Sequence, residues 1–211
     1  LKTPVAAMQI CLETLEAHDD LPADKRREFI ARCLSQSDRL RRLLADVATI
    51  TSLDEGAADV AFTAVDLRSA ITEVAELNLP VAEAKGFAVS VDVAAGITLH
   101  GNRPLLASVF QNLIDNALAY SNGSRIAISA RKYGKEIRIE VADDGVGVAE
   151  EHLPHLFERF YRVDKGRSRA AGGTGLGLAI VKNAIALHRG SIQASLRKPS
   201  GLVFIITLPL D

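Results

Sequence analysis

The stretch Glu136-Ile-Arg-Ile-Glu-Val-Ala-Asp-Asp-Gly-Val-Gly147 places a short strand directly before two carboxylates and two glycines. The strand is expected over 136–141, and Gly134 before it indicates a hairpin with a second strand over 125–131. A carboxylate at a strand end can accept a hydrogen bond from an exocyclic amine, and glycines without a Cβ let the backbone approach a flat ring. The same Asp-Asp-Gly sequence is also an ordinary turn, so the residues alone leave both interpretations open.

The residues around this stretch alternate between short strands and helices. Further strands are expected over 62–65, 87–93, 97–99, 191–196 and 202–208, and helices over 67–84, 103–120 and 175–188. We expect Asp66 to cap the first of these helices, and Ile97-Thr-Leu99 to pair beside strand 87–93. Strands that come largely in adjacent pairs, with three helices between them, predict an α+β fold, in which a mixed sheet carries its helices on one face.

The first fifty or so residues have a helical periodicity instead. Apolar residues recur at alternating steps of four and three over 1–15 and, with Gln36 as the one polar member, over 29–50. Pro22 suits the first turn of the second helix. Two such helices, 1–17 and 22–52, would form an antiparallel hairpin that cannot bury both apolar stripes alone. We expect a second copy to complete a four-helix bundle. The alternative is that the stripes pack on the rest of the chain.

Composition excludes several other classes of protein. Of 211 residues, 48% are hydrophobic and 24% are charged, which suffices for a real core. A formal net charge of -1 argues against an overall nucleic-acid binder. The longest apolar run is far shorter than the roughly 20 residues of a membrane-spanning helix. From the net charge and this run length together, we expect contact with neither nucleic acid nor a membrane. Two cysteines, Cys11 and Cys33, are too few for a disulfide framework.

Two asparagines on the helix expected over 103–120 are candidates for cation binding. Asn112 and Asn116 are four residues apart and therefore share one helix face. Their amide oxygens could serve a hard cation or its coordinated water. The alternative is a solvated polar edge.

A glycine-rich segment and a basic segment point to phosphate. Gly172-Gly-Thr-Gly-Leu-Gly-Leu178 runs into a helix, whose first N–H groups and positive dipole end suit a polyphosphate. It lacks the Lys-Ser/Thr ending of a P-loop. The preceding segment 159–169 holds Arg159, Arg162, Lys165, Arg167 and Arg169 against Asp164, and we interpret it as a lid over a triphosphate. The alternatives are a solvated basic loop and a nucleic-acid patch.

In order and spacing, these four segments resemble the N, G1, F and G2 boxes of bacterial sensor histidine kinases. The opening Leu1-Lys2-Thr3-Pro4 resembles the tail of that family's H box, His-Glu/Asp-Leu-Lys-Thr-Pro. The resemblance covers essentially the whole chain. It implies a dimerisation and phosphotransfer hairpin over 1–54, a linker over 55–61 and an ATP-binding catalytic domain over 62–211, an α/β sandwich of the Bergerat type with three main helices.

The resemblance also implies roles for individual residues. Mg²⁺ would lie on Asn116, Asn112 would lie close to the triphosphate, and Asp143 would accept from the adenine amino group. The other implied residues line the base, hold the phosphates or anchor the lid by apolar contact: Tyr120, Gly145, Gly147, Phe157, Phe160, Gly173, Thr174, Gly175, Leu176 and Gly177. Arg162 and Arg159 would contact the γ-phosphate.

Two features depart from the family pattern. Many relatives have Lys or His where this chain has Ala119, so one phosphate contact would be absent. The acceptor histidine would lie two positions before Leu1, and the 211-residue polypeptide is therefore expected to bind ATP without phosphorylating itself. The chain's own histidines are expected at the surface or at helix caps: His18, His100, His152, His155 and His188.

The activity that the resemblance implies is an ATP-dependent protein-histidine kinase. A homodimer would pass the phosphoryl group to an Asp in the receiver domain of a response regulator, and Thr3 would orient water for dephosphorylation of that partner. The parent is expected to be a bacterial protein anchored in the inner membrane, with this part in the cytoplasm. One alternative is a gyrase-type ATP hydrolase, which has Glu in place of Asn112. The other is a nucleotide-sensing dimer or phosphatase without kinase activity.

Overall fold

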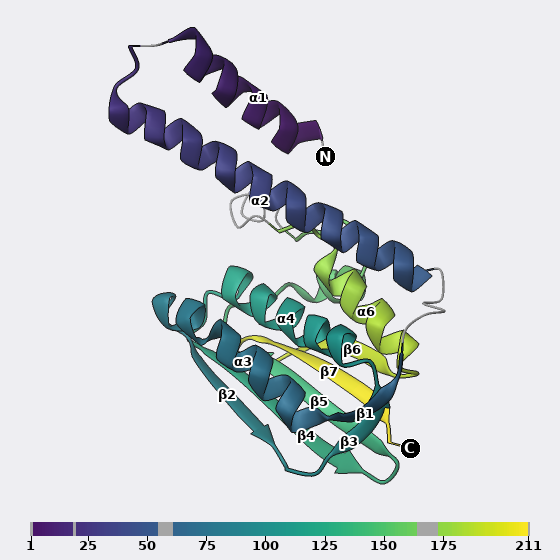
Figure 1. Ribbon diagram of the computed structural model, residues 1–211. Coiled ribbons are helices and arrows are strands. Elements are labelled where there is room, and N and C mark those ends of the chain that lie inside the picture. The colour runs from purple at the N-terminus through teal and green to yellow at the C-terminus, as the bar shows by residue number, and fades with distance from the viewer. Residues whose placement is uncertain (1, 19, 55–60, 164–172, 211) are drawn as a thin grey trace. The chain divides into compact units, whose positions relative to one another are not determined.

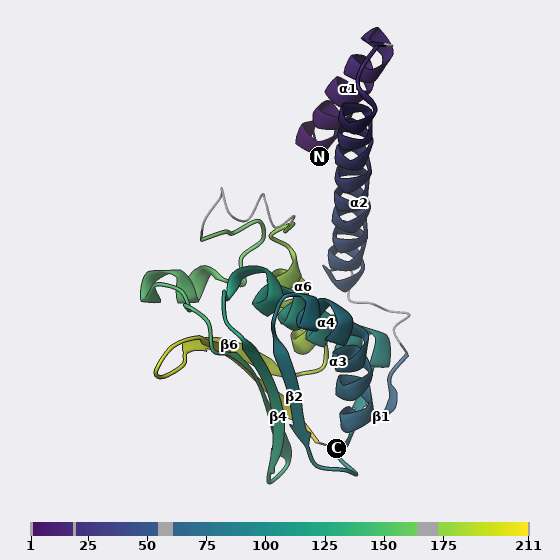
Figure 2. The same cartoon turned by 90° about the vertical axis from the view of Figure 1, so that its left-hand side faces the viewer.

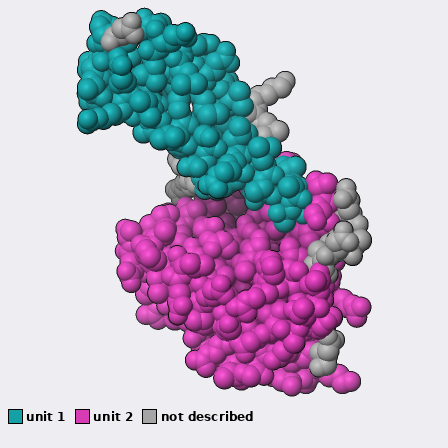
Figure 3. Space-filling model, viewed as in Figure 1, with its two compact units in different colours: residues 1–49 teal, residues 50–211 magenta. Residues whose placement is uncertain are grey.

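The computed structural model describes residues 2–18, 20–54, 61–163 and 173–210. The chain divides into two compact units, residues 1–49 and residues 50–211, which Figure 3 shows in different colours. None of the helices in these described ranges is long and apolar enough to cross a membrane.

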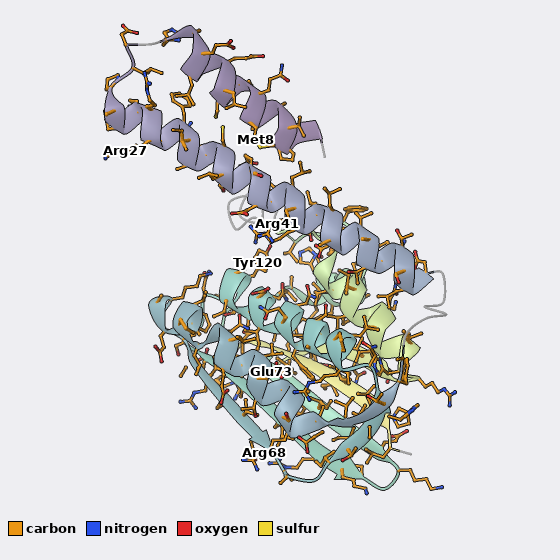
Figure 4. The ribbon with its side chains drawn as sticks, in the orientation of Figure 1. Met8, Arg27, Arg41, Arg68, Glu73 and Tyr120 are labelled. Carbon is orange, nitrogen blue, oxygen red and sulfur yellow. The ribbon has the colours of Figure 1, made fainter. Side chains whose placement is uncertain are left out.

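The first unit consists of helix α1 (Lys2–Ala17) and most of helix α2 (Ala23–Asp54). The two helices touch where the Cys33 thiol lies 3.7 Å from the carbonyl oxygen of Met8, on the side of α1 that faces α2 in Figure 4. Large apolar side chains of this unit are nevertheless exposed: Val5, Ile10, Leu12, Ile30, Leu34, Leu44 and Val47. The hairpin is present as expected, and within this unit its apolar stripes are only partly covered.

The second unit is built on a five-stranded mixed sheet. Its strands are β2 (Ala88–Val93), β4 (Arg125–Tyr133), β5 (Glu136–Asp143), β7 (Leu202–Pro209) and β6 (Ser191–Leu196), in that spatial order. The β2–β4 pair is parallel and the other pairs are antiparallel. Figures 1 and 2 show that α3 (Leu67–Ala84), α4 (Arg103–Tyr120) and α6 (Gly177–Leu187) lie together on one face of this sheet. The expected mixed sheet with helices on one face is confirmed.

The core lies between the sheet and these helices. Alternate residues of the central strands point to the helices, and they are at most 1% exposed: Ile126, Ile128, Ile137, Ile139 and Ile206. Phe110 and Leu106 of α4 meet them and are fully buried. The helix starts follow from capping, because the Asp66 carboxylate accepts from Ser69 N at 2.6 Å and the Asn102 side chain accepts from Leu105 N at 2.9 Å.

A second, two-stranded antiparallel sheet joins β1 (Thr63–Asp66) to β3 (Thr98–Gly101). The expected pairing of Ile97-Thr-Leu99 beside strand 87–93 is therefore wrong, since Leu99 pairs with Val65. Both of these side chains are 3% exposed. A strand of four residues buries only one or two side chains, so its periodicity does not identify its partner.

His188 joins the end of α6 to the start of α4. It is the C-cap of α6, as expected for a cap histidine, and it is only 4% exposed. Its Nε2 accepts from Asn102 N, the N-cap of α4, at 2.9 Å, and its Nδ1 donates to Ala184 O at 2.7 Å. Burial lowers the pKa of His188, which favours this neutral ring. The end of α6 is thereby fixed to the beginning of α4.

Candidate functional site

Helix α4 presents a partly exposed polar face beside its buried one. Asn112, Asn116 and Tyr120 follow at steps of four and are each partly exposed, and Figure 4 places Tyr120 at the C-terminal end of the helix. The neighbouring positions Leu113 and Ile114 are at most 1% exposed against the sheet. The two asparagines therefore share a face, as the spacing predicted.

The Asn112 side chain is fixed rather than simply solvated. Its Nδ2 donates to Ser108 O at 2.8 Å. Its Oδ1 lies so close to Gly177, the first residue of α6, that a Cβ there would be 2.5 Å from it. A larger residue at position 177 would therefore require the Asn112 amide to move from its present position.

The N-terminus of α6 is available to an anion. Its N-cap residue is Leu176, which makes no side-chain capping bond because an apolar side chain has no acceptor. The turn before it is ordered by Thr174, whose Oγ1 accepts from Leu176 N at 3.2 Å. The first N–H groups and the positive dipole end of α6 meet the Asn112 oxygen here, an arrangement that suits phosphate and its counter-cation.

Asp143, the last residue of β5, is a buried carboxylate with 6% exposure. Its Oδ1 accepts from Gly145 N at 2.9 Å and from Leu202 N at 3.4 Å. Burial raises the pKa of Asp143, against the lowering effect of these two backbone donors. Both bonds use Oδ1. None of the hydrogen bonds between described residues uses Oδ2, which can therefore accept from a ligand amine.

The glycines beside Asp143 are required by packing. A Cβ on Gly145 would be 2.1 Å from Ser121 O, and a Cβ on Gly201, which has φ +110°, would be 2.1 Å from Asp143 O. Gly147 has φ +65°, where side chains are disfavoured. Gly145 was expected to let the backbone approach a ligand ring, and in the structure it makes a close contact with Ser121 at the end of α4.

Asp144 is a site residue that the sequence argument missed. Its Oδ1 accepts from Ser124 N at 2.7 Å and from Arg125 N at 2.8 Å, and its Oδ2 accepts from Ser124 Oγ at 2.9 Å. These donors hold the pKa of Asp144 at about 2, below the usual 3.8. The only signal in the sequence was its position between Asp143 and Gly145.

The segment after the short helix η1 (Glu150–His155) meets the glycine-rich turn through its backbone. Phe160 N donates to Gly175 O at 2.8 Å, and both residues have positive φ. The Phe157 ring packs on Phe204 at 6.1 Å between centroids. Phe160 is 65% exposed, and its contact with the glycine-rich turn is made by its backbone.

The two described lid arginines already have partners. Arg159 pairs with the Asp54 carboxylate, with its Nη2 at 2.6 Å and 2.8 Å from the two oxygens. Both side chains are nearly half exposed, so the pair is worth about 0–1 kcal/mol. Arg162 donates to Gly173 O. These bonds use only Nη2 of each guanidinium, so other N–H groups of both arginines can contact a phosphate.

Several expected site features lie outside the described residues. These are Lys165, Arg167, Arg169 and Gly172, together with the side chain of Thr3 in the first turn of α1.

Two shallow depressions, of about 170 and 230 Å³, lie elsewhere, around Glu136 and Thr207. No residue of the four motifs other than Glu136, at the opposite end of β5 from Asp143, lines them, so they are not part of this site.

Within the described ranges, no group of three or more His, Cys, Asp or Glu side chains could hold a metal ion. The resemblance implies a cation on the amide oxygen of Asn116, together with oxygens of the ligand. This donor set suits Mg²⁺, which in phosphate sites keeps few protein ligands.

Comparison with known families assigns both units. Residues 1–56 match the His Kinase A (phospho-acceptor) domain. Residues 101–211 match the histidine kinase-, DNA gyrase B-, and HSP90-like ATPase family, an ATP-binding domain.

Curated relatives are sensor kinases. The chain is 39% identical over 210 residues to the sensor-like histidine kinase SenX3 of Mycolicibacterium smegmatis, covering 99% of this chain and 54% of that protein. It is 33% identical over 212 residues to the signal transduction histidine-protein kinase BaeS of Escherichia coli, covering 100% of this chain and 45% of that protein. The chain thus spans about half the length of these relatives.

Solved structures show the same fold. The histidine kinase AdeS of Acinetobacter baumannii superposes with a TM-score of 0.83 at 23% identity, over 100% of this chain and 97% of that one. The histidine kinase ThkA in complex with the response regulator protein TrrA gives a TM-score of 0.77 at 22% identity, over 100% of this chain and 58% of that one. With both family models and the curated relatives in agreement, the chain belongs to the sensor histidine kinases of two-component systems.

Proposed function

We propose that the chain is the kinase core of a two-component sensor histidine kinase. It binds Mg-ATP in the second unit, the γ-phosphoryl group passes to a histidine of the H box, and from there to an Asp of a response regulator. The single observation that carries the proposal is that α4 contacts both motifs: its Asn112 oxygen lies against Gly177 at the start of α6, and its C-cap Ser121 contacts Gly145, two residues after the buried Asp143.

Each part of this edge suits one part of the nucleotide. The free oxygen of Asp143 accepts from the adenine amino group, Tyr120 and Gly147 line the base, and Gly173–Gly177 with the N-terminus of α6 hold the phosphates. Asn116 contributes an oxygen to Mg²⁺, which when bound neutralises charge on the phosphates.

The residues of this chain act mainly by positioning. In phosphoryl transfer the protein aligns the groups and stabilises charge, and Arg162 beside Gly173 is placed to turn toward a γ-phosphate. Ala119 offers no charge, so the lid arginines carry a larger share of the neutralisation. Arg159 joins them through the N–H groups that its pair with Asp54 does not use.

The hairpin supplies the acceptor and the partner surface. We assign residues 1–54 to dimerisation and phosphotransfer, 55–61 to a linker and 62–211 to catalysis. The exposed Leu34 and Leu44 of α2 support a second copy completing a four-helix bundle. The fold similarity to ThkA, whose solved structure contains the response regulator TrrA, supports a receiver domain as partner. Thr3 in the H-box tail supports dephosphorylation of that partner beside the kinase activity.

Phosphate transfer from labelled ATP tests this function. A polypeptide in which the H-box histidine stands two positions before Leu1 should gain acid-labile label from γ-labelled ATP. The 211-residue polypeptide should bind ATP and gain none. Release of free phosphate without any labelled protein would instead favour the ATP hydrolases of the superfamily. Label on the 211-residue polypeptide itself would show that one of its five histidines is an acceptor.

A further inference from the structure

The Asp144 carboxylate is hydrogen-bonded to a segment about twenty residues earlier in the sequence. Both of its oxygens accept from Ser124 and Arg125, at the start of β4, over distances of 2.7 to 2.9 Å. From the other side, Ser200 Oγ donates to the Asp144 carbonyl at 3.4 Å. A carboxylate that accepts two backbone N–H groups and a hydroxyl has a fixed orientation. It holds the α4–β4 connection against the end of β5.

The same connection contacts the residues after Asp143 at a second point. Ser121 follows the last residue of α4, and its carbonyl oxygen accepts from Val146 N at 2.8 Å. The Ser121 hydroxyl accepts from Gly123 N at 3.1 Å. A Cβ on Gly123 would be 2.4 Å from Asp144 Oδ1. Ser121, Gly123 and Ser124 thus each contact the turn at 143–146.

This packing determines where α4 lies relative to Asp143. A helix is stiff along its axis, so a displacement of its C-terminal end also displaces the asparagines one and two turns before it. Under the proposed function, on which this inference rests, Asp143 holds the base while Asn112 and Asn116 serve the triphosphate of the same nucleotide. A misplacement of about 1 Å between two such groups can reduce a rate about 100-fold.

We propose that Asp144 is the positioning residue that joins the two halves of the nucleotide site, by fixing the end of α4 to the end of β5. Asp144 does not touch the nucleotide. It sets the spacing between the base half, at Asp143, and the phosphate half, at Asn112, Asn116 and α6. Ligands that span both halves therefore depend on it, and ligands that occupy one half do not.

Titrations of the 211-residue chain with three ligands test this. The ligands are Mg-ATP, which spans both halves, adenosine, which occupies the base half, and Mg-triphosphate, which occupies the phosphate half. Asp144→Ala should weaken Mg-ATP about tenfold or more, the size expected for losing hydrogen bonds to a charged group. It should weaken adenosine and Mg-triphosphate less than about twofold.

Two further variants with smaller expected effects and one matched control complete the test. Asp144→Asn retains an oxygen for the two backbone donors and can donate to Ser124 Oγ, so it should restore most of the Mg-ATP affinity. Ser124→Ala removes one of the three bonds and should give a loss of about two- to threefold. Asp92→Ala removes an exposed carboxylate that pairs with Arg131 on the β2 side of the sheet, and should leave all three affinities unchanged. If Asp144→Ala does not fold, Ser124→Ala alone decides.

The outcomes separate the inference from the proposed function. An equal loss for adenosine and Mg-ATP would overturn the inference, since Asp144 would then shape only the base pocket. Unchanged Mg-ATP affinity in both Asp144→Ala and Ser124→Ala would overturn it as well. Failure of the wild-type chain to bind Mg-ATP would remove the proposed function, and the inference with it.

Discussion

The helical unit, residues 1–49, and the α+β unit, residues 50–211, differ in where their apolar side chains lie. The α+β unit closes its own core, with Phe110 and Leu106 fully buried between the sheet and α4. The helical unit leaves Leu34 63% exposed and Ile10 62% exposed. The comparison teaches that one unit is stable through its own packing, whereas the other needs a further surface. Loss of a large apolar side chain should therefore lower the stability of the α+β unit, whereas a charge on the exposed stripe of the helical unit should weaken assembly.

The largest effect is expected in the core of the α+β unit. Phe110→Ala removes a fully buried ring and leaves a cavity, so the free energy of unfolding of this unit should fall by about 3–5 kcal/mol. Denaturant titration followed by circular dichroism measures it. A loss below 1 kcal/mol would mean that this core is not closed.

The second effect is a loss of Mg-ATP affinity with no loss of stability. Asp143→Asn should weaken Mg-ATP binding about 10- to 100-fold, because it replaces a charged acceptor by an amide. Burial raises the pKa of Asp143, so its ionised form is disfavoured in the fold, and the variant should be at least as stable as the wild type. Calorimetric titration and thermal unfolding measure the two quantities. A fall in melting temperature together with the loss of Mg-ATP affinity would show instead that Asp143 supports the fold.

The third effect is on assembly. Leu34→Glu places a charge on the exposed stripe of α2 and should raise the dimer dissociation constant about tenfold or more, with Mg-ATP affinity unchanged. Leu77→Glu is the matched control, because Leu77 is 72% exposed on α3 of the other unit, and it should leave the dimer intact. Sedimentation equilibrium measures both. An unaffected Leu34→Glu dimer would contradict the use of this stripe for dimerisation.

The smallest effect is on pH dependence. The folded-state pKa of His188 lies below its usual 6.5, so its contribution to stability is complete above about pH 6.5 and is lost as the pH falls toward the folded value. His188→Gln should flatten the fall in melting temperature over that window. Asp144 has the same sign at lower pH, since its pKa of about 2 lies below 3.8 and its contribution is lost only between those values. An unchanged profile in His188→Gln would show that another group titrates there.

Local signals predicted much of the fold because they act over a few residues. Asp66 caps α3 as expected, and the strands at 125–131 and 136–141 form the expected hairpin. The partner of Ile97-Thr-Leu99 could not be found this way, because a short strand can pair with any edge that its few buried residues allow. The choice of Val65 for Leu99 depends on the whole core.

The sequence indicated which residues belong to the candidate site better than it indicated the contacts that those residues make. Gly177 lies against Asn112, and Asp143 is buried at the end of β5; the roles that the resemblance implies for these residues stay predictions. The close contact of Gly145 with Ser121 and the bonds of Asp144 depend on residues 19 or more positions away, which no local pattern reveals. Phe160, which has a positive φ, likewise bonds through its backbone to Gly175, fifteen positions away.

The central claim is that the edge formed by α4, the end of β5 and the start of α6 binds Mg-ATP. Titration of the isotopically labelled chain with Mg-ATP, followed by amide chemical shifts, tests it most directly. We predict that the shifted amides gather in residues 112–120, 143–147 and 173–179. Shifts that gather instead around Glu136 and Thr207, at the depressions near the other end of β5, would contradict the claim, as would the absence of any shifts.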